Sequence, residues 1–207
     1  MARNDKQNIS VNTINTNNID LQTIIDLNHL TAKCFEKAVP LDETIERVGE
    51  ADLLVILKSD IKIIGYGTNN IIPFETNEIN YFGSGFIDLN FRGQGLYHLL
   101  NQKRITCIDS KYIMTRTQNP KVMHGFNHLC QSFNYSMNPS IEGIIDSFAL
   151  KVAKSQYQDC NDQMICKNAY GRELMANTPK PTDFTKHMVK DLDVDNGDAI
   201  VLVGIKQ

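Results

Sequence analysis

A strand, a glycine-containing loop and a helix follow one another without interruption between Glu78 and Cys107. Residues 78–89 have the composition of a strand, and helical spacing of apolar residues begins at Leu96. Only Asn-Phe-Arg-Gly-Gln-Gly lies between them, which is room for one tight turn. A chain with this junction must pack a helix back on a sheet, so the sequence predicts a layered α/β structure.

The rest of the chain carries further strand and helix patterns. We expect strands near residues 9–14, 52–58, 61–67, 112–117 and 198–205, and helices over 20–35, 40–48, 96–107 and 120–133, with one more from Ile141. Pro73 is expected in a loop, and Asn119-Pro120 is a strong helix start. The pattern predicts one domain over residues 1–207 of the α/β (α+β) class, with a mainly antiparallel sheet and an extended region near 140–190.

Composition excludes several classes of protein. Lys and Arg number 21 against 24 Asp and Glu, giving a net charge of −3, so a broad nucleic-acid-binding surface is disfavoured. The apolar runs are much shorter than the roughly 20 residues of a membrane span. We therefore expect neither a nucleic acid nor a membrane as partner.

The cysteines and histidines suggest a protein without metal. Five cysteines with no C-x-x-C pair indicate reduced thiols, and the first eight residues lack the apolar core of a signal peptide, so a cytoplasmic location is expected. His124 and His128 share a helix face, but a full ligand set is missing, and no metal is expected. The helix from Ile141 is expected to pack on the sheet, with a homodimer face as the alternative.

The loop after residue 89 is the candidate binding site. Its backbone amides and the positive end of the following helix converge on one spot, which suits a pyrophosphate. Gly93 and Gly95 let the main chain approach a ligand closely, and Arg92 adds a positive charge. Taken alone, the same residues are also compatible with a simple glycine turn between strand and helix.

The context of this loop resembles the GNAT superfamily of acetyl-CoA-dependent N-acetyltransferases. Arg92-Gly-Gln-Gly95-Leu-Tyr97 occupies the place of the family pattern R/Q-x-x-G-x-G/A, and Thr117-Gln-Asn119-Pro120 that of the strand end followed by a helix. The resemblance covers residues 20–135 and the last strand. It implies a GNAT-like sheet in which the fourth and fifth strands splay apart.

The resemblance also implies a function. The chain is expected to transfer an acetyl group from acetyl-CoA to a primary amine, which attacks directly in a ternary complex; the acceptor is a small molecule or a peptide. The pantetheine arm would pair with strand backbone, and an N–H near Ile87 would stabilise the oxyanion. The cofactor-binding residues carried over are Ile87, Leu89, Arg92, Gly93, Gln94, Gly95, Leu96, Tyr97 and Asn119.

Two residues depart from the family pattern. Tyr97 stands where Gly or Ala is usual, so its ring must turn away from the pyrophosphate or stack beside it. Phe126 lies near the position of a Tyr that protonates the leaving thiolate, and it cannot donate a proton. These departures leave a second hypothesis, a non-catalytic GNAT-fold module that binds CoA or a peptide.

Proton-transfer residues are harder to assign. Glu78 is the first candidate for the base, and it is also compatible with a solvated carboxylate at a strand start. Tyr81 and Asp88 are alternatives that could equally serve packing and the turn. Tyr135 and His128 are the candidates for the acid that protonates the leaving thiolate. Arg116 and Lys121 could meet the cofactor's phosphates, but we expect them to be exposed charges.

Overall fold

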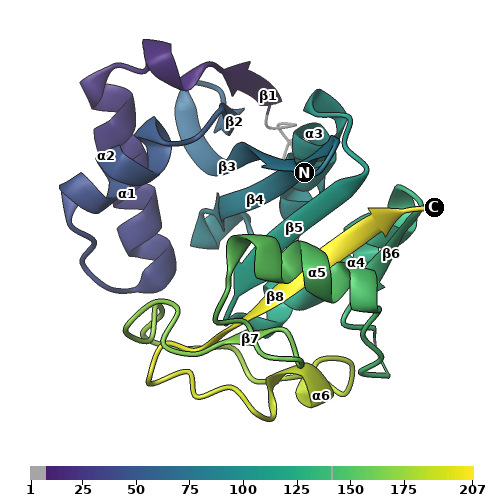
Figure 1. Ribbon diagram of the computed structural model, residues 1–207. Helices are drawn as coiled ribbons and strands as arrows, with labels where there is room; N and C mark the ends of the chain where they lie inside the picture. The colour runs from purple at the N-terminus through teal and green to yellow at the C-terminus, as the bar shows by residue number, and fades with distance from the viewer. Residues whose placement is uncertain (1–7, 141) are drawn as a thin grey trace, which may run out of the picture.

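The computed structural model describes residues 8–140 and 142–207, which form an eight-stranded sheet with helices on both faces (Figure 1). The strands are β1 Ile9–Ile14, β2 Leu53–Ser59, β3 Lys62–Phe74, β4 Asn77–Ile87, β5 Tyr112–Thr117, β6 Tyr135–Asn138, β7 Ile165–Cys166 and β8 Ala199–Lys206. The helices are α1 Leu21–Phe35, α2 Leu41–Gly49, α3 Leu96–Cys107, α4 Pro120–Ser132, α5 Ser147–Gln156 and α6 Lys186–Val189, with 3-10 turns η1 Thr16–Asn18 and η2 Leu89–Phe91.

The sheet runs in the order β1-β2-β3-β4-β5-β8-β6, and β7 pairs with β8. Neighbouring strands are antiparallel except for β4 and β5, which are parallel. The fold class predicted from the sequence, with its mainly antiparallel sheet, is therefore confirmed. No helix in the described part of the chain is long and apolar enough to cross a membrane.

Alternation along the strands sends apolar side chains to both faces. On β2, Leu54 and Ile56 pack toward α1, while Val55 and Leu57 pack toward α3, and all four are fully buried. Each such side chain contributes about 1.5–3 kcal/mol by leaving water. Across the sheet, α5 covers the same face as α1, and α4 covers the same face as α3. The middle of the sheet is therefore enclosed by helices on two sides.

Local signals set most element boundaries. Asp20 caps α1 by accepting a hydrogen bond from the Thr23 amide, and Asn119 caps α4 through the Lys121 amide, with Pro120 in the first helical position. Both starts confirm the sequence prediction.

Three predictions about the elements were wrong. Pro73 lies inside β3, which continues to Phe74. The pairing of β3 with β2 stops at Asn69, which lies opposite the first residue of β2, so the missing N–H of Pro73 costs no ladder bond on that side. The helix expected from Ile141 begins at Ser147, capped by Asp146, and Ile141 itself lies outside the described residues. The strand expected over 78–89 ends at Ile87.

Candidate functional site

An opening between β4 and β5 is the main irregularity of the sheet. The two strands pair only from Ile79 with Tyr112 to Phe82 with Thr115. Beyond that point β4 runs on to Ile87 against β3, and β5 runs on to Thr117 against β8. The residues 83–86 are only half-buried although β4 is a central strand, so this stretch of backbone is accessible from the β5 side.

A bulge in β4 lies where the opening begins. Gly67 pairs with Gly85 and Asn69 pairs with Phe82, so two residues of β4 oppose the single residue Thr68. The Ser84 amide donates to the Thr68 side-chain oxygen at 2.9 Å, which holds the bulge against β3. On the other side, the Thr115 hydroxyl donates to the Phe82 carbonyl at 2.8 Å and ends the ladder there.

The glycine loop lies just after the open stretch of β4. Gly93 and Gly95 have φ values of 78° and 74°, a left-handed backbone that favours glycine, and residues 92–95 are exposed. Gly95 is the N-cap of α3 and provides no side-chain cap. In the described chain, the amides of residues 93–98 have no protein acceptor. Several N–H groups at a helix start are thus available for an anion.

Two side chains hold this loop against the sheet. Arg92 Nε donates to the carbonyl of Ile87 at 3.3 Å, so the arginine reaches back to the end of β4. Asp88 is buried; it accepts hydrogen bonds from Lys33 Nζ at 2.6 Å and from the Asn90 amide at 3.0 Å. Burial acts to raise the pKa of Asp88, but these partners outweigh it and hold the pKa below its usual value.

Tyr97 turns inward from the start of α3. Its ring lies between Gly85 of β4 and Gly125 of α4: a Cβ on Gly125 would come within 3.0 Å of the ring, and one on Gly85 within 3.4 Å. Burial raises the pKa of Tyr97, which therefore stays neutral. The bulky residue in the glycine motif is accommodated because two other glycines make room for it.

Comparison with known proteins bears on this geometry. No protein-family model matches the sequence, and no curated protein does. Among solved structures, the chain is similar to the ribosomal-protein-S18-alanine N-acetyltransferase of Escherichia coli, with a TM-score of 0.58, 10% identity, and coverage of 97% of this chain and 96% of that one. This chain has the GNAT fold.

Two further structures support that assignment. A diaminobutyrate acetyltransferase from Paenibacillus lautus, solved with L-2,4-diaminobutyric acid and coenzyme A, matches with a TM-score of 0.55 and 10% identity over 96% of this chain and 95% of its own. A GNAT-family acetyltransferase from Bacillus cereus matches with a TM-score of 0.53 and 13% identity over 96% and 98%. At these identities the likeness establishes the fold.

Other cofactor residues expected for a GNAT fold are placed as follows. Ile87 is the last residue of β4, buried, with its carbonyl engaged by Arg92 and by the thiol of Cys34. Leu89 lies in the turn η2, so it offers no strand backbone. Leu96 is buried under the sheet, while Gln94 is exposed in the loop. Asn119 caps α4, and its amide also donates to the sulfur of Met175 at 3.4 Å.

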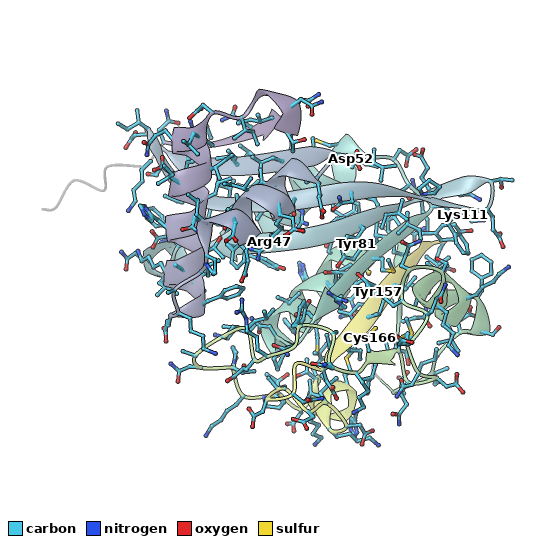
Figure 2. The ribbon with its side chains drawn as sticks, turned by 60° about the vertical axis from the view of Figure 1, so that its left-hand side comes forward. Arg47, Asp52, Tyr81, Lys111, Tyr157 and Cys166 are labelled. Atoms are coloured by element: carbon cyan, nitrogen blue, oxygen red, sulfur yellow. The ribbon has the colours of Figure 1, made fainter. Side chains whose placement is uncertain are left out.

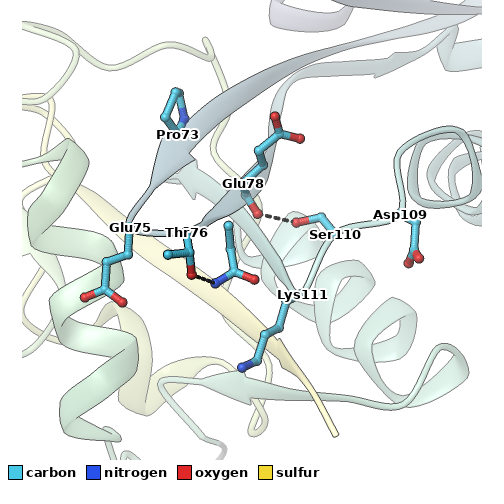
Figure 3. Close-up of a pocket in the computed structure, with 8 residues that line it drawn as sticks. Pro73, Glu75, Thr76, Glu78, Asp109, Ser110 and Lys111 are labelled. Carbon is cyan, nitrogen blue, oxygen red and sulfur yellow. Dashed lines mark hydrogen bonds between the residues drawn. The ribbon is translucent and has the colours of Figure 1, made fainter.

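The candidate base and acid do not reach the opening. Glu78 precedes the paired segment of β4, and its carbonyl accepts a hydrogen bond from Ser110, which precedes β5 (Figure 3). Tyr135 donates its hydroxyl proton to the carbonyl of the same Ser110. Because β4 and β5 are parallel, both residues lie at the start of the pair, whereas the strands part at its end. The structure therefore does not bring them together with the glycine loop.

The second candidate acid, His128, also lies away from the opening, and so does Phe126, which stands near the position of the family's proton-donating Tyr. His128 is on the surface of α4, where its Nδ1 is 3.2 Å from Nδ1 of His98. Phe126 is buried in the core, edge-on to Phe82. Among the residues that the structure describes, no contact of either side chain joins it to residues 83–86 of β4.

An arginine surrounded by tyrosines was missed by the sequence reasoning. Arg116, expected to be an exposed charge, is half-buried on β5; its guanidinium carbon lies 4.7 Å from the Tyr157 ring centre and 4.6 Å from that of Tyr170. Tyr81 of β4 lies next to Tyr157 on the same face of the sheet (Figure 2). The tyrosines come from segments far apart in sequence, so no local motif announced the cluster.

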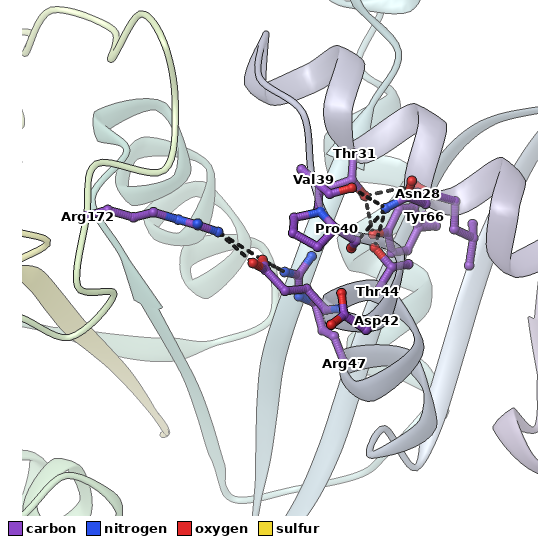
Figure 4. A network of polar contacts seen from close by, with 11 residues as sticks. Asn28, Thr31, Val39, Pro40, Asp42, Thr44, Arg47, Tyr66 and Arg172 are labelled. Carbon is purple, nitrogen blue, oxygen red and sulfur yellow. Dashed lines mark hydrogen bonds and ion pairs between the residues drawn. The ribbon is translucent and has the colours of Figure 1, made fainter.

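Residues 170–177 form a strap that joins the two halves of this face. Arg172 Nη2 contacts both carboxylate oxygens of Glu43 on α2 at 2.9 Å (Figure 4). The Ala176 amide donates to the Phe35 carbonyl at the end of α1, and the Leu174 amide donates to Gln118 beyond β5. The strap therefore crosses the molecule on the side of α1, α2 and α5.

Proposed function

We propose that the protein belongs to the GNAT superfamily and transfers an acetyl group from acetyl-CoA to a primary amine. The observation that carries the proposal is the set of free amides at residues 93–98, which lies directly after the open stretch of β4. The diphosphate would bind these amides, near Arg92, and the pantetheine arm would enter between β4 and β5. An anion site and an adjacent unpaired strand edge are what such a cofactor needs.

The chemistry follows from this arrangement. The amine nitrogen attacks the thioester carbonyl carbon, a C–N bond forms, and the C–S bond then breaks as the thiolate leaves. A backbone N–H on the open stretch 83–87 would stabilise the negative oxygen of the intermediate, a contribution of about 3–4 kcal/mol. The amine loses its proton to a base or water, and the thiolate gains one.

The fold relatives are consistent with an amine acceptor. One is named for acetylating an alanine of a ribosomal protein, and another was solved with diaminobutyric acid as its substrate. A small molecule or a peptide therefore remains the class of partner that we propose for this chain.

Titration of the protein with acetyl-CoA in a calorimeter tests the proposal. Arg92→Ala removes the charge beside the loop, and Gly95→Trp both strains the left-handed backbone and fills the open space above it. We expect each to weaken binding at least about tenfold. Gly49→Trp, at an exposed helix end with open space around it, is the matched control and should bind normally. Unchanged affinity in both loop variants would refute the site.

Release of free CoA thiol in the presence of amines tests the catalytic step. Turnover with any primary amine supports the transferase. Tight acetyl-CoA binding without turnover on every amine would instead support a non-catalytic module, the alternative that Phe126 favours because it cannot protonate a thiolate.

A further inference from the structure

Arg116 is a cation without a counterion at the edge of the opening. It follows Thr115, the last β5 residue that pairs with β4, so it is the first residue of β5 beside the parted strands. Its Nε is buried and has no hydrogen-bond partner. Within residues 8–140 and 142–207, no carboxylate lies within ion-pair distance of its guanidinium. A half-buried charge in this state is costly unless something else pairs with it.

The neighbours of Arg116 hold the guanidinium in place but do not neutralise it. Tyr157 and Tyr170 stack near it, and the Tyr170 hydroxyl donates to the Arg116 carbonyl at 2.8 Å. Burial acts against the charge, yet the surrounding tyrosines raise the pKa of Arg116, so the group stays cationic. A planar, immobilised guanidinium presents two parallel N–H donors, the geometry that a carboxylate matches.

Arg104, the other arginine near the opening, differs from Arg116 in having partners within the protein. That arginine is also buried near the opening, but it donates to Asn69 at 2.8 Å, to Asn101 at 3.0 Å and to the Thr68 carbonyl at 2.5 Å. Each of its three nitrogens has a partner inside the protein, and the side chain is 1% exposed, so it is closed to a ligand. Of these two arginines, only Arg116 remains open.

The position of Arg116 relative to the glycine loop suits a ligand that reacts with the cofactor's thioester, which is the acceptor. The loop leads into α3, which packs on one face of the sheet, whereas Arg116 and Tyr81 lie on the other face, with α5. An arm entering from the loop through the opening would present its thioester beside Arg116. The strap of residues 170–177 crosses this same face and joins α1 and α2 to the end of β5, which favours a small acceptor over a folded protein surface.

We propose that Arg116 binds the carboxylate of the acceptor, and that the acceptor is a free amino acid whose amine is acetylated. This inference rests on the proposed function and narrows its substrate class. The carboxylate would sit against the guanidinium between Tyr157 and Tyr170, and the amine would point toward the open stretch of β4.

Matched pairs of substrates test the inference. The common L-amino acids, together with lysine homologues bearing shorter side chains, are compared with their α-carboxamides, which keep the shape but lose the charge. For at least one pair we expect kcat/KM to favour the acid by about 10- to 100-fold, the range of a charge-assisted hydrogen-bonded contact. In Arg116→Met the ratio should fall to about one, and Arg116→Lys should retain part of it. Lys154→Met, which removes the same charge from an exposed ion pair on α5, should keep the wild-type ratio.

Binding measurements keep the inference falsifiable if turnover is slow. Calorimetry on the CoA-saturated protein should show amino acids binding to the wild type and to Lys154→Met, but at least tenfold more weakly to Arg116→Met. Equal use of acids and amides, an unchanged ratio in Arg116→Met, or no binding of any amino acid would each overturn the inference. Acetyl-CoA binding is measured in the same samples, so a failure of the proposed function itself would be recognised separately by the loss of that signal.

Discussion

Replacement of Arg104 by methionine would test the account of the buried polar network beneath the opening. The arginine is 1% exposed, lies 4.4 Å above the Phe82 ring, and donates to Asn69, Asn101 and the carbonyl of Thr68. Burial lowers its pKa to about 10, so it remains charged at neutral pH. A methionine fills similar volume but leaves three buried acceptors without a donor.

The expected loss of stability follows from these contacts. Each orphaned acceptor costs about 1–3 kcal/mol, while removal of the buried charge recovers several kcal/mol of desolvation. We therefore expect Arg104→Met to lower the free energy of unfolding by about 3 kcal/mol, measured by urea denaturation followed by circular dichroism. Lys103→Met on the same helix should change it by less than about 0.5 kcal/mol. A loss below about 1 kcal/mol for Arg104→Met would show that water or rearranged side chains satisfy these acceptors.

Two further predictions concern acid stability and the proton-transfer candidates Glu78 and Tyr135. Burial acts to raise the pKa of Asp198, but hydrogen bonds from Lys167 at 2.6 Å and from the amides of Asn168 and Asp193 hold it below the usual value. The contribution of Asp198 to the free energy of unfolding is therefore present above about pH 4 and is lost as the pH falls through the lowered pKa. Asp198→Asn should unfold more easily at pH 7, and its free energy of unfolding in urea titrations should depend less steeply on pH below about 4. The same pH dependence in the variant and the wild type would contradict this. Glu78→Gln and Tyr135→Phe should leave acetyl-CoA affinity and thiol release within about twofold of the wild type, because both contact Ser110 at the closed end of the strand pair; a large loss of turnover would return them to the active site.

The parts of the fold that could be predicted are those specified by local sequence. Asn119-Pro120 set the start of α4 through one cap and one fixed φ, and the strand–glycine–helix junction placed α3 directly after β4. The strands β6 and β7 contain four and two residues, too few for a period to emerge, and they form because β8 offers the edge that does not pair with β5. The sequence predicts a loop at Pro73 because the cost of a proline in a strand depends on whether another strand lies beside it, and the sequence does not show this.

The candidate site also has parts set by local sequence and parts set by tertiary structure. The conformation of the glycine loop depends on a few consecutive residues, so the turn at Gly93 and Gly95 and the helix start after it could be predicted. The position of the Tyr97 ring depends on Gly85 and Gly125, which lie 12 and 28 positions away in the sequence. The position of Glu78 at the paired end of β4 and β5 could not be predicted, because a parallel register decides which end of a strand meets which end of its neighbour, and only tertiary structure supplies that register.

Arg104 and Arg116 illustrate why charge in a sequence does not reveal its role. Both are arginines in apolar-patterned segments near the same opening, yet β3 surrounds the first with acceptors, whereas tyrosines surround the second. A guanidinium whose nitrogens all have partners inside the protein stabilises the fold, whereas one with an unpartnered nitrogen and no counterion can be stabilised by a bound ligand. The two methionine variants should therefore differ in kind: Arg104→Met lowers the free energy of unfolding, while Arg116→Met loses only the stacking, about 1 kcal/mol, and changes acceptor selectivity. A large loss of stability in Arg116→Met would mean that its partners lie within the protein.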